Sequence, residues 1–222
     1  MIDINKWMQA YEQAVMNAFG GRVLFIGLQG SYGRNEASES SDIDVVLILN
    51  SVDIEDLKIY KEITRQLPYR ERLCGFVSGR DEISNWSRAD LFQFYRDTLA
   101  VWGSLEELLP PLGDIHARQA VLTGACGIYH ACSHNFLHAM DAAALSALYK
   151  SAFFVLQAKL YCENEKYIRS RMEMRELARG EDLDIFQISS DSSLITPDTL
   201  EQYTQKLLAW SGKLICSYGD HR

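Results

Sequence analysis

The sequence predicts an α/β head followed by an all-helical bundle. Within the first 110 residues, short runs rich in Val, Ile and Leu alternate with amphipathic helical patterns, which is typical of an α/β unit. Pro110-Pro111 and Gly113 then interrupt the pattern, and the remaining sequence follows a helical period almost throughout. We therefore expect two domains, residues 1–110 and residues 111–222.

The head begins with a helix over residues 3–19, where apolar side chains recur at helical spacing until Gly20-Gly21. Apolar runs of strand length predict buried β-strands. A second amphipathic helix is expected to end at Pro68, because proline interrupts helical hydrogen bonding. The remaining head elements expected, in order, are a strand in "RVLFIGLQG", a strand in "DIDVVLIL", a helix in "DIEDLKIYKEITRQL", a strand in "YRERLCGFVSG", a helix over 87–97 and a short strand in "TLAVWGS".

The second half predicts helices over residues 114–138, 141–163, 166–180 and 198–217. Gly180 is expected to end the third of these, because glycine commonly follows a helix C-terminus. A polar loop, "SSDSSLITPD", precedes the last helix. These segments predict a helical bundle.

Composition excludes several classes of protein. A net charge of -8 argues against a nonspecific nucleic-acid binder, which is normally basic. Five scattered cysteines without a CxxC pair indicate reduced thiols. The polar N-terminus is unlike a signal peptide, and no apolar run approaches the ~20 residues that cross a bilayer. We expect a cytoplasmic protein with no membrane or nucleic-acid polymer partner.

Two carboxylates open the second predicted strand. Asp42 and Asp44 are two residues apart and therefore point to the same face, roughly 6 to 7 Å from one another. Carboxylates turned toward an apolar core are costly to desolvate unless a cation accompanies them. Hard oxygen ligands of this kind suit Mg²⁺, which usually completes its shell with water and substrate phosphates. The pair predicts a magnesium site.

A glycine-serine turn precedes the pair by ten residues. Gly30 follows the first predicted strand, where the lack of a side chain lets the backbone approach a ligand. Residues after Gly30 would open a short helix whose free N–H groups attract an anion, and the Ser31 hydroxyl adds a donor. Either feature alone is usually a simple turn or a solvated strand end. Together they describe a metal-nucleotide site.

The segment "GSYGRNEASESSDIDVVLIL" resembles the signature of the DNA polymerase β-like nucleotidyltransferase superfamily, and it is most similar to minimal and aminoglycoside-type nucleotidyltransferases. Gly-Ser, the ten-residue spacer and Asp-x-Asp all match, as do Arg34 and Ser41. The resemblance implies an α/β (α+β) nucleotidyltransferase head with a short mixed sheet, fused to helices. It further implies nucleotidyl transfer from a nucleoside triphosphate, with Gly30 and Ser31 at the phosphates and Asp42 and Asp44 holding Mg²⁺.

Members of this superfamily usually add a third carboxylate from the next strand. By register we expect it near Leu73 or Gly75, and neither is acidic. Glu71 lies on the same face by alternation and could substitute as a catalytic residue if the strand is shifted. The alternative is that Glu71 is a solvated strand end. The aminoglycoside-modifying relatives also use a glutamate from the helical domain, and "TGACGIYHACSHN" here has no acid.

The helical half contributes further candidates. Lys150 would suit a triphosphate or anionic substrate if it faces the active site, and otherwise it lies on a solvated helix face. His130, His134 and His138 recur every four residues and so form one stripe on their helix. Such a stripe could bind a metal or supply a base, but more often it is a polar seam.

Two functions follow. The first is an Mg²⁺-dependent nucleotidyltransferase that moves a nucleoside monophosphate to a hydroxyl of a small molecule or protein. The second is a non-catalytic nucleotide-binding or antitoxin-like regulatory protein that keeps the fold without the third carboxylate. The acceptor, the nucleotide base and the oligomeric state stay open, and a homodimer is compatible with the sequence.

Overall fold

The computed structural model describes residues 2–39 and 41–219. Contacts divide the chain into two compact units. The head unit comprises Met1–Ser87 and Asp97–Pro111, and the helical unit comprises Arg88–Arg96 and Leu112–Arg222. The boundary expected at 110/111 differs from this division mainly in residues 88–96, which the sequence assigns to the head. Within the described ranges, every helix is too short or too polar to span a membrane.

A four-stranded mixed sheet forms the centre of the head unit, in the order β3-β2-β1-β4. Its strands are β1 (Val23–Leu28), β2 (Ile43–Leu49), β3 (Leu73–Gly79) and β4 (Leu99–Trp102). β1 pairs antiparallel with β2 and β4, whereas β2 and β3 run parallel. The predicted strands and the mixed sheet are therefore confirmed.

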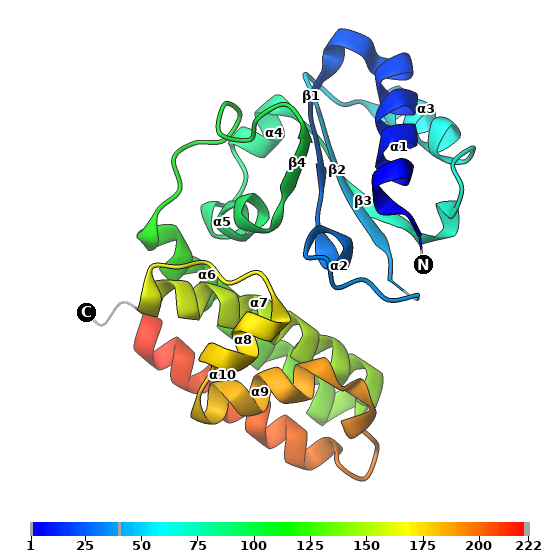
Figure 1. Cartoon of the computed structure of the whole chain (residues 1–222). Coiled ribbons are helices and arrows are strands. Elements are labelled where there is room, and N and C mark those ends of the chain that lie inside the picture. Colours follow the sequence, from blue (N-terminus) through cyan, green and yellow to red (C-terminus); the bar gives the residue numbers. More distant parts are fainter. Residues whose placement is uncertain (1, 40, 220–222) are drawn as a thin grey trace. The chain divides into compact units, whose positions relative to one another are not determined.

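Helices α1 (Ile4–Phe19) and α3 (Ile54–Thr64) lie on one face of this sheet (Figure 1). Alternate residues of β2 point to that face, so Ile43, Val45, Leu47 and Leu49 join the core beneath α1. Asp3 caps α1 by accepting a hydrogen bond from Lys6 N, and Gly20 ends it with a positive φ of 52°. The pleat of β2 therefore leaves Asp44 on the other face.

Short elements connect the strands. Helix α2 (Gly30–Gly33) follows β1, the 3₁₀ turn η2 (Arg70–Arg72) precedes β3, and α4 (Arg80–Ser84) follows β3. The third strand is shorter than expected, because residues 69–72 are not part of it. Tyr69, with φ of 59°, starts the turn that takes the chain out of strand geometry.

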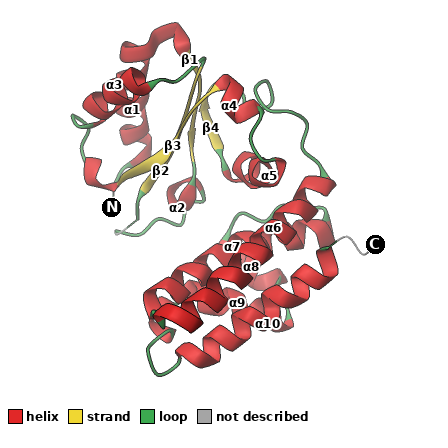
Figure 2. Ribbon diagram, turned by 180° about the vertical axis from the view of Figure 1, so that it is seen from behind, coloured by secondary structure: helices red, strands yellow, loops and turns green. Residues whose placement is uncertain are grey.

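The helical unit contains long helices that run side by side (Figure 2). They are α6 (Asp114–His134), α7 (Ala142–Asn164), α9 (Gly180–Ser190) and α10 (Leu200–Tyr218), with the shorter α5 (Arg88–Asp97) and α8 (Arg171–Leu177). The predicted helix over 166–180 is wrong in its extent, since only α8 is helical there. Gly180 begins α9 instead of ending the preceding helix, and α9 itself was not predicted.

Contacts within the helical unit explain why α5 belongs to it. The Phe92 ring packs against the Tyr161 ring with centroids 4.9 Å apart, and the Arg169 Nε atom donates to the Arg96 carbonyl at 2.5 Å. Ala89 lies in the same core as Leu156 and Trp210. The amphipathic period of α5 was visible in the sequence, but the core it would join was not.

Candidate active site

Four side chains form a row across the sheet, one from each strand or its end. Asp44 pairs with Cys74 of β3 in the parallel register. On its other side, Gln29 N donates to the Asp44 carbonyl at 2.8 Å, and the Gln29 side chain donates to the Thr98 hydroxyl at 2.7 Å. Paired residues of neighbouring strands share a face, so Thr98, Gln29, Asp44 and Cys74 point the same way.

Gly30 lies directly against the Asp44 carboxylate. A Cβ atom at Gly30 would be 1.9 Å from Asp44 Oδ2, and φ at Gly30 is 65°. Both facts require glycine, since L side chains rarely adopt this backbone and nothing larger than hydrogen fits. The turn predicted to hold phosphate and the carboxylate predicted to hold metal are therefore in contact.

The two acidic residues differ in exposure and act on each other's charge. Asp42 immediately precedes β2 and is exposed, whereas Asp44 is partly buried. Burial raises the pKa of Asp44, and the nearby Asp42 charge raises it further, while Arg34 and a hydrogen bond with Cys74 lower it. A cation between the carboxylates would oppose the first two effects. Throughout the part of the chain that the structure describes, no three His, Cys, Asp or Glu side chains gather to hold a metal.

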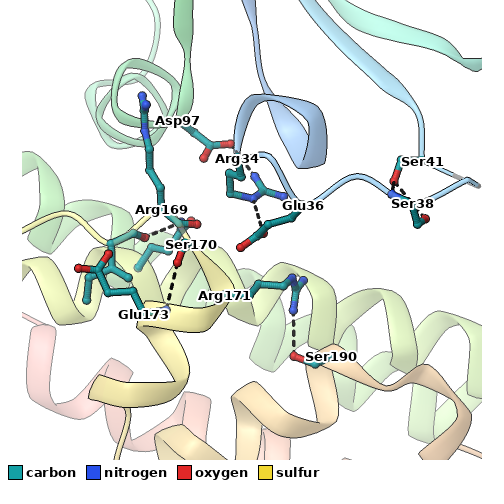
Figure 3. Close-up of polar contacts among 12 residues, drawn as sticks. Arg34, Glu36, Ser38, Ser41, Asp97, Arg169, Ser170, Arg171, Glu173 and Ser190 are labelled. Atoms are coloured by element: carbon teal, nitrogen blue, oxygen red, sulfur yellow. Dashed lines mark hydrogen bonds and ion pairs between the residues drawn. The ribbon is translucent and has the colours of Figure 1, made fainter. Parts of the chain in front are cut away.

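Arg34 is held close to this site by two acids (Figure 3). Its Nη1 atom donates to Asp97 Oδ2 at 2.9 Å, and its Nε atom donates to Glu36 Oε2 at 3.3 Å. The side chains of Arg34 and Asp97 are each only 9% exposed, so the guanidinium is fixed in place and its charge acts on Asp44. The predicted role of Arg34 in nucleotide binding stays a prediction.

The two predicted serines lie in different local settings. Ser31 is in the first turn of α2, next to Gly30, with its carbonyl accepting from Glu36 N at 2.8 Å. Ser41 closes a turn, because its hydroxyl accepts from Ser38 N at 2.8 Å (Figure 3). A role of either serine in nucleotide binding stays a prediction, and for Ser41 the visible role is to shape the loop before Asp42.

Glu71 does not lie where the sequence analysis expects it. It belongs to the 3₁₀ turn η2, and the register places Cys74, not Leu73 or Gly75, beside Asp44. The expected register was wrong by one residue, which moves the odd-numbered residues of β3 to the opposite face. The prediction that Glu71 shares a face with the missing carboxylate is therefore wrong, and the structure gives no geometric support for its catalytic role.

Lys150 lies on α7, in the helical unit. It is exposed and borders a hollow of about 390 Å³ that small side chains from the first turns of α7 line together with Ile195. Its role in nucleotide binding stays a prediction. The three predicted histidines lie on α6 and on the π-helical turn η3 (Asn135–Ala139), and all three are exposed.

Comparison with known proteins agrees with this geometry. Residues 12–96 match the family model described as the nucleotidyltransferase domain. This segment includes β1, α2, β2 and β3, and hence Gln29, Asp44 and Cys74 of the row, whereas Thr98 lies just beyond it. The resemblance to nucleotidyltransferases is confirmed. A search of curated proteins found no match.

The fold of this chain is also found in a solved structure. The structure of spectinomycin adenyltransferase AAD(9) from Enterococcus faecialis, with ATP and spectinomycin, matches with a TM-score of 0.54 and 12% identity. The match covers 91% of this chain and 98% of that chain. It confirms the predicted combination of an α/β head with a helical region.

Sequence reasoning missed four members of the site. Gln29, Thr98 and Cys74 enter the row through strand pairing, and Asp97 joins the site through its ion pair with Arg34. Asp97-Thr98 is 54 residues beyond Asp44, so only the position of β4 at the edge beside β1 reveals the proximity. One available signal was Asp97 itself, an acid at the end of a predicted helix and just before an apolar strand.

Proposed function

We propose that this chain is an Mg²⁺-dependent nucleotidyltransferase that transfers a nucleoside monophosphate from a nucleoside triphosphate to a hydroxyl group. The acceptor class we propose is a small molecule. The observation that carries the proposal is the contact between Gly30 and Asp44, since it joins a phosphate-binding turn to a cation-binding carboxylate at one point.

The residues present fit a hard divalent cation. Asp42 and Asp44 offer carboxylate oxygens, and the pKa of Asp44 is raised first by burial and then by the Asp42 charge, both of which a bound cation would offset. Asp42 and Asp44 would hold Mg²⁺, which supplies charge stabilisation for the phosphates when bound. The remaining coordination would come from water and from the triphosphate itself.

The chain's own groups bind and orient the substrate. The Gly30 backbone and the Ser31 hydroxyl would receive the terminal phosphates, because a glycine with positive φ exposes N–H groups to an anion. Arg34, fixed by Asp97 and Glu36, would add positive charge near the acidic pair. In the reaction, the acceptor oxygen forms a bond to the α-phosphorus, the bond to the bridging oxygen breaks, pyrophosphate leaves and the hydroxyl proton passes to solvent. Most of the rate would come from positioning and electrostatics.

A solved structure with the same fold supports a small-molecule acceptor. Spectinomycin adenyltransferase, which shares the fold, was solved with ATP and a small-molecule acceptor, and this agrees with a small hydroxyl compound. At 12% identity the likeness extends to fold alone, so the acceptor itself must be found by screening.

The test is pyrophosphate release with Mg²⁺, each of the four common triphosphates and a panel of hydroxyl compounds that includes aminocyclitols. The Asp42→Asn, Asp44→Asn double variant should lose Mg²⁺-dependent triphosphate binding in calorimetry while its circular dichroism spectrum is unchanged. Unchanged binding in the double variant would refute the proposed site. As a matched control, Asp53→Asn removes a head-unit acid that only caps α3, and triphosphate binding should persist.

A second function is a non-catalytic nucleotide-binding protein. The observation that favours it is Cys74, which occupies the position beside Asp44 from which a third carboxylate is expected. The two functions differ in one result. A binding protein would take up Mg²⁺ and triphosphate through Asp42 and Asp44 but release no pyrophosphate with any acceptor of the panel.

A further inference from the structure

Three of the five histidines of the chain lie within nine residues, outside the candidate active site. His130 and His134 are on α6, and His138 is on the π-helical turn η3 that continues it. Spacing of four residues places all three on one exposed stripe. Nothing in the proposed nucleotidyl transfer uses this stripe.

The distances between ring centroids distinguish the His134–His138 pair from the His130–His134 pair. The His134 and His138 ring centroids are 4.7 Å apart, with 56° between the ring planes, whereas those of His130 and His134 are 6.4 Å apart. With metal–nitrogen bonds of about 2.1 Å and ring nitrogens about 1.1 Å from the centroid, two imidazoles on one ion have centroids about 4.5 to 5.2 Å apart at angles of about 90 to 110°. The first pair meets this range. The second would require an angle near 180°.

Hydrogen bonds of Asn135 hold the backbone of the turn that contains His138. Met140 N donates to the Asn135 carbonyl at 2.7 Å, which closes the wide π-helical turn. The buried Asn135 side chain donates to the Asp141 carbonyl at 3.0 Å and accepts from Asp141 N at 3.1 Å. Asp141 in turn caps α7. His138 is therefore presented on a backbone that two helices and a buried amide hold in place, so little ordering is needed before a ligand binds.

We propose that His134 and His138 bind one divalent transition-metal ion of the borderline class, such as Ni²⁺, Zn²⁺ or Cu²⁺. Imidazole nitrogen suits these ions, whereas Mg²⁺ prefers oxygen. The site supplies two protein ligands and leaves the other positions to water, in agreement with the absence of any three-residue metal cluster from the described residues. A bound ion would link the last turn of α6 to η3 and stabilise the helical unit.

The test is calorimetric titration of the full chain with Ni²⁺. Ni²⁺ is preferable to Zn²⁺ here because Cys74, Cys126 and Cys216 are exposed, and thiolates bind Zn²⁺ strongly. We expect one site of micromolar affinity, weakened at least tenfold in His134→Ala and in His138→Ala. The midpoint of thermal unfolding should rise with Ni²⁺ in the parent and not in these two variants.

The same stripe provides the matched control, since His130→Ala removes an equally exposed histidine one turn away. It should leave the Ni²⁺ affinity within twofold of the parent, and so should the Asp42→Asn, Asp44→Asn variant. The proposal is overturned if the parent does not bind Ni²⁺, if His130→Ala loses as much affinity as His138→Ala, or if the aspartate variant alone loses the site. The result is independent of nucleotidyl transfer.

Discussion

Replacing Gly30 with alanine probes the contact on which the proposed active site depends. The new Cβ would lie 1.9 Å from Asp44 Oδ2, whereas separations under 3.0 Å are essentially never seen at a real Cβ. The separation must therefore increase by at least about 1.1 Å. The Asp44 side chain has to make this movement, because hydrogen bonds to β1 and β3 hold the β2 backbone in place.

The substitution is expected to lower both the stability of the fold and the reaction rate. The alanine must also adopt a left-handed backbone, which costs roughly 1 to 2 kcal/mol of folding stability. Displacing a catalytic group by about 1 Å costs on the order of 100-fold in rate. We therefore expect Gly30→Ala to fold with a modestly lower unfolding free energy and to lose about 100-fold in pyrophosphate release with Mg²⁺ and triphosphate.

Gly20 supplies the matched control. Its φ is 52°, close to the 65° of Gly30, but no atom lies within 4 Å of a Cβ built there. Gly20→Ala should also lose stability in chemical denaturation, since a φ of 52° with a ψ of -128° strains any L side chain, but its activity should be unchanged. If Gly30→Ala turns over within threefold of Gly20→Ala, Asp44 does not act in the reaction from its position beside Gly30, and the reasoning fails.

Three further outcomes are expected. Ser31→Ala should weaken triphosphate binding by about 1 to 2 kcal/mol, the worth of one hydrogen bond to a charged group, as measured by calorimetry; unchanged affinity would show that its hydroxyl does not reach the phosphates. Glu71→Gln should change turnover by less than threefold, because η2 holds Glu71 outside the row of Asp44 and Cys74, and a loss of about 100-fold would restore it as a base. Asp56→Asn should lower stability at neutral pH, because the hydrogen bond with Arg22 depresses the pKa of Asp56 in the folded protein. That stabilisation is present above the ordinary carboxyl pKa and disappears as the pH falls through the depressed value, so the parent and variant unfolding free energies should converge in acid; a difference that is constant with pH would contradict it.

The sequence by itself determined the elements that depend on local pattern. Helix α1 and strands β1 and β2 follow from apolar spacing within a few residues. The types and spacing of Gly30, Asp42 and Asp44 are likewise local features, and they are what predicts a metal-nucleotide site. The helix over 166–180 failed for a local reason, since Gly180 can end one helix or begin the next and the pattern does not distinguish these.

Only the tertiary structure decided which residues stand beside Asp44. Side chains alternate between the two faces of a strand, so an error of one residue at the start of β3 exchanges Cys74 for Leu73 or Gly75 beside Asp44, and Glu71 lies in the turn η2 before the strand. The same holds for Thr98, which β4 brings to Gln29 from 69 positions away. Hydrophobic alternation fixes which face of each strand is buried, but the register between strands depends on turns such as η2, whose geometry no periodic pattern encodes.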